Sequence, residues 1–345
     1  MSEIANYFLY RNAEGETGLS ANSIDDLNLD DLFAEIDYCH SSIGRQYLYY
    51  LLLSDKTSGM EKQEALLSSL ATHTELRTLL SNALKELDKP DAYSIVSILE
   101  NDNTGIGAKE MVLINICRFL PLLFLALMLL THSGVFLTLF VFSFVANAVL
   151  HYRNKAKIQR YFFSIPQLLK MIRQAGKLAQ NKEFVSVDPS ITTDLKDVEG
   201  LKKYISYFRF NLSLDNDMAI LFYMAAELIR VFFLHEAYAV GRTFHLLKEK
   251  ATAIHNVYRF IGFVDSILSV AILREELPYY CLPGDNRAGE RLRTQAVYHP
   301  LIENCIPNDM VLHEKSALIT GSNMAGKTCF MRTIGVNLLA AKTLH

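Results

Sequence analysis

The sequence predicts a mainly α-helical protein, with a helical core and lever and an apolar helical hairpin, followed by the beginning of an α/β P-loop domain. Three observations predict this arrangement. Apolar residues recur at helical spacing through residues 29–100 and again through residues 218–280. Residues 119–150 contain no Asp, Glu, Lys or Arg. Residues 321–328 read Gly-x-x-x-x-Gly-Lys-Thr, and an apolar run precedes them while a helical pattern follows.

The composition narrows the class of protein before any motif is considered. The chain has 345 residues, of which 50% are hydrophobic, and its formal net charge is -3. The chain therefore has no overall positive charge that would attract nucleic acid. Binding to nucleic acid would need a local patch of basic residues. The five cysteines are scattered and form no Cys-x-x-Cys pair. This argues against a disulfide scaffold or a zinc site and suits a reducing compartment.

The first predicted helices occupy residues 29–54, with a polar break at Ser41 and Ser42. Asp30 and Asp31 stand where the positive end of a helix dipole favours acidic side chains. Residues 61–100 then carry leucines at spacings of three and four, which predicts further amphipathic helices.

The uncharged region predicts two membrane-crossing helices joined by a turn at residues 131–134. Residues 111–130 would extend about 30 Å as a helix, and residues 135–150 about 24 Å. The basic residues that follow the region are Arg153, Lys155, Lys157 and Arg160. They predict that both flanks lie on the cytoplasmic face of the inner or plasma membrane. The alternative is a buried hairpin in the core of a cytoplasmic protein.

A third apolar stretch, residues 218–240, differs because it contains ionisable residues. Glu227, Arg230 and Glu236 would be costly in lipid. We therefore expect a long packed helix outside the membrane, which continues through further helices to about residue 280.

The residue pattern of the sequence changes after residue 278. Two prolines and a glycine interrupt the helical pattern within residues 278–285. Residues 295–302 and 315–320 are apolar enough to predict short strands, the second of them central in a sheet.

The glycine-rich loop predicts a site for ATP and Mg²⁺. Glycines allow the backbone N–H groups to point at phosphate oxygens, and the following helix N-terminus favours negative charge. Lys327 would reach the β- and γ-phosphates, and the Thr328 hydroxyl would bind Mg²⁺. The predicted cofactor-binding residues of the loop are Gly321, Ser322, Asn323, Met324, Ala325, Gly326, Lys327, Thr328 and Cys329.

Four segments resemble the MutS family of DNA mismatch-repair ATPases. The loop "TGSNMAGKT" contains the Asn-Met-Ala-Gly-Lys run typical of that family. The segment "YHPLIENCIPNDM" resembles the family's His-Pro strand followed by Ile-x-Asn, which packs near the nucleotide base. "FVDSILSVAILREELPYYCLP" resembles the helix that leads into the ATPase domain. "LDDLFAEIDYCHSSIGRQYLYYLLL" resembles the beginning of the helical core and lever.

The resemblance implies a domain order, partners and two more site residues. Ile306 and Asn308 would lie near the base, DNA is a candidate partner, and a homodimer would form through the C-terminal ATPase part. The expected segments are an N-terminal lead at 1–28, a first core part at 29–110, a transmembrane hairpin at 111–150, a second core and lever part at 151–280, and the start of a P-loop ATPase domain at 281–345.

The sequence also departs from the family pattern. Helices of core type begin near residue 29, which leaves no room for a mismatch-reading domain. Cys305 stands where many members carry an aromatic residue against adenine. The sequence ends before the Walker B acid, so we expect the front part of a longer ATPase, inactive in hydrolysis as it stands. The apolar segment 317–320 would then lack neighbouring strands, which predicts a poorly preorganised loop and weak binding.

Two other classes of function fit parts of the pattern. An ATP-binding cassette membrane transporter would also combine apolar helices with a phosphate loop, although two spanning helices are few for a transport path. A non-catalytic interaction scaffold is the third class. ATP turnover stimulated by DNA or by transport would distinguish these functions.

Overall fold

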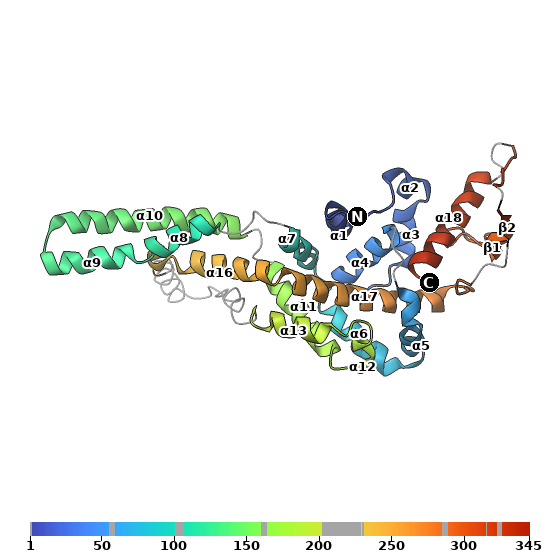
Figure 1. Cartoon of the computed structure of the whole chain (residues 1–345), viewed down its shortest axis with the longest axis horizontal. Coiled ribbons are helices and arrows are strands. Elements are labelled where there is room, and N and C mark those ends of the chain that lie inside the picture. Colours follow the sequence, from blue (N-terminus) through green and yellow to red (C-terminus); the bar gives the residue numbers. More distant parts are fainter. Residues whose placement is uncertain are drawn as a thin grey trace. The chain divides into compact units, whose positions relative to one another are not determined.

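The computed structural model is mainly helical, which confirms the mainly α-helical part of the predicted class (Figure 1). It describes residues 2–54, 59–100, 107–159, 164–201, 229, 231–284, 289–314, 316–322 and 326–345. The chain forms two compact units. The first unit consists of Met1–Tyr93, Lys177–Pro189 and Arg259–His345, and the second of Ser94–Gly176 and Ser190–Tyr258.

The first unit is a helical core with a small β-pair. Its helices are α1 (Ser2–Ala13), α2 (Ala21–Asp26), α3 (Leu29–Ile36), α4 (Ser42–Leu53), α5 (Glu64–Thr72), α6 (Thr74–Lys85), α12 (Lys182–Val185) and α18 (Lys327–Thr343), with 3-10 turns η1 (Met60–Gln63) and η2 (Pro90–Ser94). The long helix α17 (Ala251–Glu276) supplies residues to both units.

Helices α3 and α4 confirm the pattern expected for residues 29–54. Asp30 and Asp31 lie in the first turn of α3, where the helix dipole favours them. The Ser41 side chain caps α4 by accepting a hydrogen bond from the Gly44 N–H. Nearly every residue of α4 is buried, including glutamine and tyrosine side chains, because helices pack on several sides of it.

A buried carboxylate joins α17 to the start of α4. Asp265 is fully buried and accepts hydrogen bonds from the His40 N–H (3.0 Å), the Ser41 N–H (2.9 Å) and the Ser41 hydroxyl (2.6 Å). Burial raises the pKa of Asp265 to about 7, although these donors lower it. One turn further along α17, Ser269 donates to the Ile36 carbonyl and accepts from the Tyr38 N–H. We call this set of bonds the Asp265 junction.

Two glycines allow the helices at this junction to approach closely. A Cβ atom at Gly44 would lie 2.0 Å from Asp265 Oδ2, and one at Gly262 would lie 2.5 Å from the Tyr47 Cβ. Any larger residue would therefore force α4 and α17 apart.

The second unit contains the apolar hairpin. Its helices are α7 (Ile95–Glu100), α8 (Ala108–Cys117), α9 (Leu120–Thr131), α10 (Gly134–Gln159), α11 (Ser164–Leu178), α13 (Ile191–Glu199) and α16 (His235–Glu249). Figure 1 shows α9 and α10 side by side, joined by the turn expected at residues 131–134. His132 adopts a left-handed conformation there and ends α9.

The hairpin differs from the expectation in two respects. The first helix is not continuous, because it breaks at Arg118 and Phe119, just before Pro121 at the start of α9. A proline ring is tolerated in the first turn of a helix but not in its interior, so the chain starts a new helix there. The second helix is longer than residues 135–150 and continues to Gln159.

Within the part of the chain that the structure describes, three helical stretches are long and apolar enough to cross a membrane by length and composition. They are Lys109–Thr131, Gly134–Arg153 and Ala251–Glu276, and their most apolar windows are 11%, 22% and 72% buried, respectively. The third stretch is α17, whose apolar residues pack inside the protein. Most apolar side chains of the first two stretches are exposed or partly exposed.

The C-terminal part of the first unit holds two strands and a helix. Strands β1 (Glu290–Val297) and β2 (Asn308–His313) pair antiparallel, with Thr294 opposite Met310. The predicted strand at 295–302 is thus only partly correct, because β1 ends at Val297 and a turn follows. The strand predicted at 315–320 is wrong for 316–320, which are exposed and irregular. No strand of the described residues pairs with them, and a strand needs such a partner for its backbone groups.

Candidate phosphate-binding site

The site is built on the start of α18, the helix expected to follow the glycine-rich loop. Gly326 has φ +78°, a left-handed conformation that glycine adopts without strain, and α18 begins at the next residue. The Lys327 side chain donates a hydrogen bond back to the Gly321 carbonyl. This hydrogen bond brings the lysine amine from the start of α18 to the first glycine of the loop.

Part of the predicted loop lies outside the described residues, namely Asn323, Met324 and Ala325. Gly321 and Ser322 are exposed and belong to no helix or strand. The N–H groups at the start of α18 have no helical acceptor, as in any helix, so they are available to an anion.

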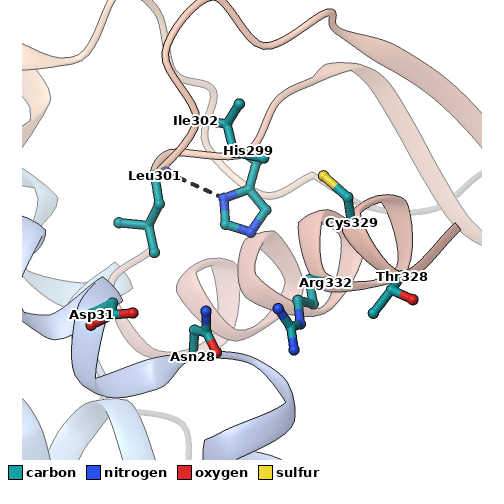
Figure 2. A pocket seen from close by; sticks show the side chains of 8 residues that line it. All are labelled: Asn28, Asp31, His299, Leu301, Ile302, Thr328, Cys329 and Arg332. Carbon is teal, nitrogen blue, oxygen red and sulfur yellow. Dashed lines mark hydrogen bonds between the residues drawn. The ribbon is translucent and has the colours of Figure 1, made fainter. Parts of the chain in front are cut away.

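A cavity of about 460 Å³ lies beside the first turns of α18 (Figure 2). Its lining residues come from α18, from the turn after β1, and from the start of α3. They are Asn28, Asp31, His299, Leu301, Ile302, Thr328, Cys329 and Arg332. In Figure 2 the His299 ring lies between the 299–302 turn and α18. Helical spacing brings Thr328 and Arg332, four residues apart, to the cavity together.

The surroundings of the His299 imidazole favour its neutral form. Burial lowers its pKa, and the positive charge of Arg332 lowers it further. The ring Nδ1 accepts a hydrogen bond from the Leu301 N–H at 3.3 Å, so in the neutral ring Nε2 carries the proton. His299 therefore offers a neutral N–H donor at the cavity.

Arg332 ties α18 to the chain that precedes α3. Its Nε donates to the Asp26 carbonyl at 2.6 Å. A few residues further along α18, a Cβ atom at Gly335 would lie 2.7 Å from Leu27 Cδ2, so the backbones approach closely there too. The helix that would bind phosphate at its N-terminus is thus bound along its side to the helical core.

The structure brings together only some of the predicted site residues. Lys327, Thr328 and Cys329 lie in the first turn of α18, and the last two line the cavity. Ile306 is 80% exposed and does not line it, nor does Asn308, which begins β2.

Sequence reasoning missed Asn28, Asp31, His299 and Arg332 as lining residues. Arg332 could have been found from its helical spacing to Thr328. The other three come from distant segments, and no local pattern in the sequence relates them to the loop. Among the described residues, no cluster of three or more His, Cys, Asp or Glu side chains could hold a metal ion.

Comparisons with known proteins relate part of the chain to MutS proteins. No family model matches. The chain is 32% identical over 117 residues to the endonuclease MutS2 of Thermus thermophilus, which is 32% of this chain and 15% of that protein. It is 42% identical over 98 residues to the DNA mismatch repair protein MutS of another strain of Thermus thermophilus, covering 28% and 12%. For the MutS of Aquifex pyrophilus the identity is 38% over 96 residues, covering 26% and 11%.

These matches cover only part of this chain and only part of each relative. The matched stretches span about a third of this chain and less than a sixth of the length of the relatives. Over that stretch, the chain is related to the MutS and MutS2 proteins.

Proposed function

We propose that this chain is a MutS-related ATP-binding protein whose helical core responds to nucleotide bound at residues 321–329. The observation that carries the proposal is the start of α18: left-handed Gly326, then Lys327 at the first helical position with its amine at the Gly321 carbonyl. Phosphate oxygens would replace that carbonyl as the acceptor for Lys327, and the Thr328 hydroxyl would bind Mg²⁺.

The residues present suit a triphosphate. A positively charged amine, a hydroxyl and the free N–H groups of a helix N-terminus are the donors that phosphate and Mg²⁺ use in such loops. The neutral His299 N–H and the Arg332 guanidinium add two further donors at the adjacent cavity. With ATP bound, the loop would hold the β- and γ-phosphates and their Mg²⁺.

The contacts of α18 give a route from nucleotide to the helical core. Arg332 bonds to the Asp26 carbonyl, Gly335 packs on Leu27, and α3 follows directly. A shift of α18 on nucleotide binding would therefore move the start of α3. DNA as the partner and a homodimer are proposals that rest on the relatives named as mismatch repair proteins.

Replacing Lys327 by Ala tests nucleotide binding. We expect magnesium-dependent binding of a fluorescent ATP analogue to weaken at least tenfold, because the amine that meets the phosphates is lost. The measurement is fluorescence anisotropy on the full chain in detergent solution. Lys342→Ala is the matched control, since it removes the same charge from an exposed position in the last turn of the same helix and should bind normally. Equal binding by both variants and the wild type would refute the proposed site.

We further propose that the hairpin of α9 and α10 anchors the chain in a membrane. In a water-soluble hairpin the apolar side chains are buried and the polar ones are exposed, whereas α10 shows the opposite arrangement. Phe142 is 73% exposed, whereas Ser143, Asn147 and His151, spaced by one helical turn, are buried on one face of α10. Membrane helices place apolar side chains toward lipid and polar ones toward neighbouring helices. The charged side chain at the helix break is also held by neighbouring side chains. The Arg118 guanidinium stacks on the Phe119 and Tyr238 rings, 4.5 and 4.3 Å from their centroids.

The anchor predicts that the protein resists extraction by alkaline carbonate. Two charges on the exposed face of the hairpin, in the double variant Phe142→Lys and Val145→Lys, should release most of it into the soluble fraction. Each lysine at the membrane midplane costs about 3 kcal/mol. The control places two lysines at exposed apolar sites of the first unit, Leu9 and Leu79, and should leave fractionation unchanged. Wild-type protein in the soluble fraction would contradict the anchor.

A further inference from the structure

The chain just before α16 packs against the middle of the hairpin. Residues 231–233 are helical, and Leu234 turns the chain with φ +47° before α16 begins. The Phe232 ring lies 6.2 Å from the Phe140 ring and 6.3 Å from the Phe144 ring, measured between centroids. These residues thus contact α10 inside its uncharged part.

The position of this contact along α10 fixes its depth. By the helical rise, Phe140 and Phe144 lie about 9 and 15 Å along the axis from Gly134, in an uncharged run of about 25 Å. Phe232 therefore meets α10 near the middle of that run. If α10 crosses the hydrocarbon layer, Phe232 lies in that layer as well, because the two side chains are in contact.

Backbone carbonyl groups at this point have hydrogen-bond partners within the protein, which a lipid environment requires because it contains no water. The turn at Leu234 interrupts the helical bonds, and the Asn147 side-chain amide donates to the Phe232 carbonyl at 3.0 Å. The same amide donates at 3.2 Å to the Cys117 carbonyl, where α8 ends. One buried asparagine thus serves the carbonyls at two helix breaks that lie at the same level. Without water, an unbonded carbonyl would cost several kcal/mol, so breaks are tolerated only with such partners.

The outer side chains of the same segment are apolar. Ile229 is 59% exposed and Phe233 is 37% exposed, while Val231 and Leu234 are buried. The exposed apolar surface of α10, which includes Phe142 and Val145, is therefore accompanied by further apolar side chains on the segment that contacts it.

We propose that Ile229 and residues 231–238 lie in the membrane with the hairpin, so that lipid contacts Ile229 and Phe233 as well as α9 and α10. This inference rests on the proposed anchor and enlarges it from a two-helix hairpin to a bundle of at least three segments. It also replaces the expectation that the stretch 218–240 packs outside lipid. That expectation came from Glu227 and Arg230, which lie outside the described residues, and from Glu236.

The interior of the unit explains how such a stretch can enter lipid. Arg118 is covered by the ring of Tyr238, and Asn147 is buried between α8 and Phe232. A polar interior of this kind is where ionisable residues of a membrane segment find partners. A charged residue in place of Ile229, on the outer surface, would have no such polar partner.

Cysteine labelling in phospholipid vesicles tests the inference on the full chain. The background replaces all five native cysteines, Cys39, Cys117, Cys281, Cys305 and Cys329, by Ser. Into it are placed, one at a time, Ile229→Cys and Phe233→Cys, with Phe142→Cys as the hairpin reference and Leu79→Cys as the water-exposed reference. We expect a membrane-impermeant maleimide to label the first three at least tenfold more slowly than Leu79→Cys.

A second measurement distinguishes a residue that is shielded by lipid from one that is shielded by other parts of the protein. A fluorophore attached to Ile229→Cys under denaturing conditions, followed by reconstitution, should be quenched by nitroxide-labelled lipid as strongly as one at Phe142→Cys. Fast labelling at 229 and 233 with a protected 142 would overturn this inference and leave the anchor standing. Slow labelling without lipid quenching at 229 would overturn it too. Fast labelling at 142 would remove the anchor itself, and with it this proposal.

Discussion

Replacing Asp265 by Ala is expected to lower the free energy of unfolding by about 3–5 kcal/mol. The substitution removes the acceptor for the His40 and Ser41 N–H groups, and Ser41 is fully buried. A buried donor without a partner costs about 1–3 kcal/mol, and the lost side-chain volume adds a cavity. Urea unfolding in detergent solution, followed by far-ultraviolet circular dichroism, measures the change.

Two further variants make this prediction specific. Asp265→Asn restores one carbonyl acceptor but turns an amide toward the Ser41 N–H, so its loss should be smaller than that of Asp265→Ala. Ser266→Ala removes only a hydroxyl bond to the Gly262 carbonyl within the same helix, and should cost about 1 kcal/mol or less. If Asp265→Ala unfolds at the same urea concentration as Ser266→Ala, the Asp265 junction does not stabilise the core.

Replacing Gly44 by Ala is expected to destabilise the protein by about 3 kcal/mol, although alanine is the better helix former. The new Cβ would lie 2.0 Å from Asp265 Oδ2 and 2.4 Å from Asp265 Cγ. Asp265 cannot move away without losing its three hydrogen bonds, so α4 and α17 must separate. The same unfolding measurement detects the loss.

Gly176→Ala is the matched control for the glycine prediction. Gly176 also lies in a helix, α11, but a Cβ atom there would meet nothing within 4 Å. The substitution should therefore be neutral or stabilise by up to about 1 kcal/mol, because alanine restricts the unfolded chain. Gly44→Ala should thus destabilise the protein, whereas Gly176→Ala should not. Equal stability of both would show that α4 and α17 do not meet as closely as the structure places them.

The sequence determined those features that depend on neighbouring residues. Helical spacing and the acids at its first turn predicted α3, and the polar break at Ser41 preceded α4. The glycine-lysine pair predicted a helix beginning near Lys327, because only local backbone geometry is needed there. The absence of charge in residues 119–150 predicted the apolar hairpin and its turn, since composition alone limits how such a segment can be solvated.

The tertiary structure decided what depends on partners distant in the chain. The segment 316–320 has a strand-like composition, but strands form only against neighbours, and composition does not show whether a neighbour exists. The cavity beside α18 joins Asp31, His299 and Arg332, which no local spacing relates. Asp265 looked like one polar residue in an apolar helix, and only the fold shows that its carboxylate holds the start of α4. The charges of the stretch 218–240 argued against lipid, whereas the contacts of Phe232 with Phe140 and Phe144 place Phe232 itself beside the hairpin. Solvation of a side chain depends on what surrounds it in space, and this information is absent from a pattern of residues along the chain.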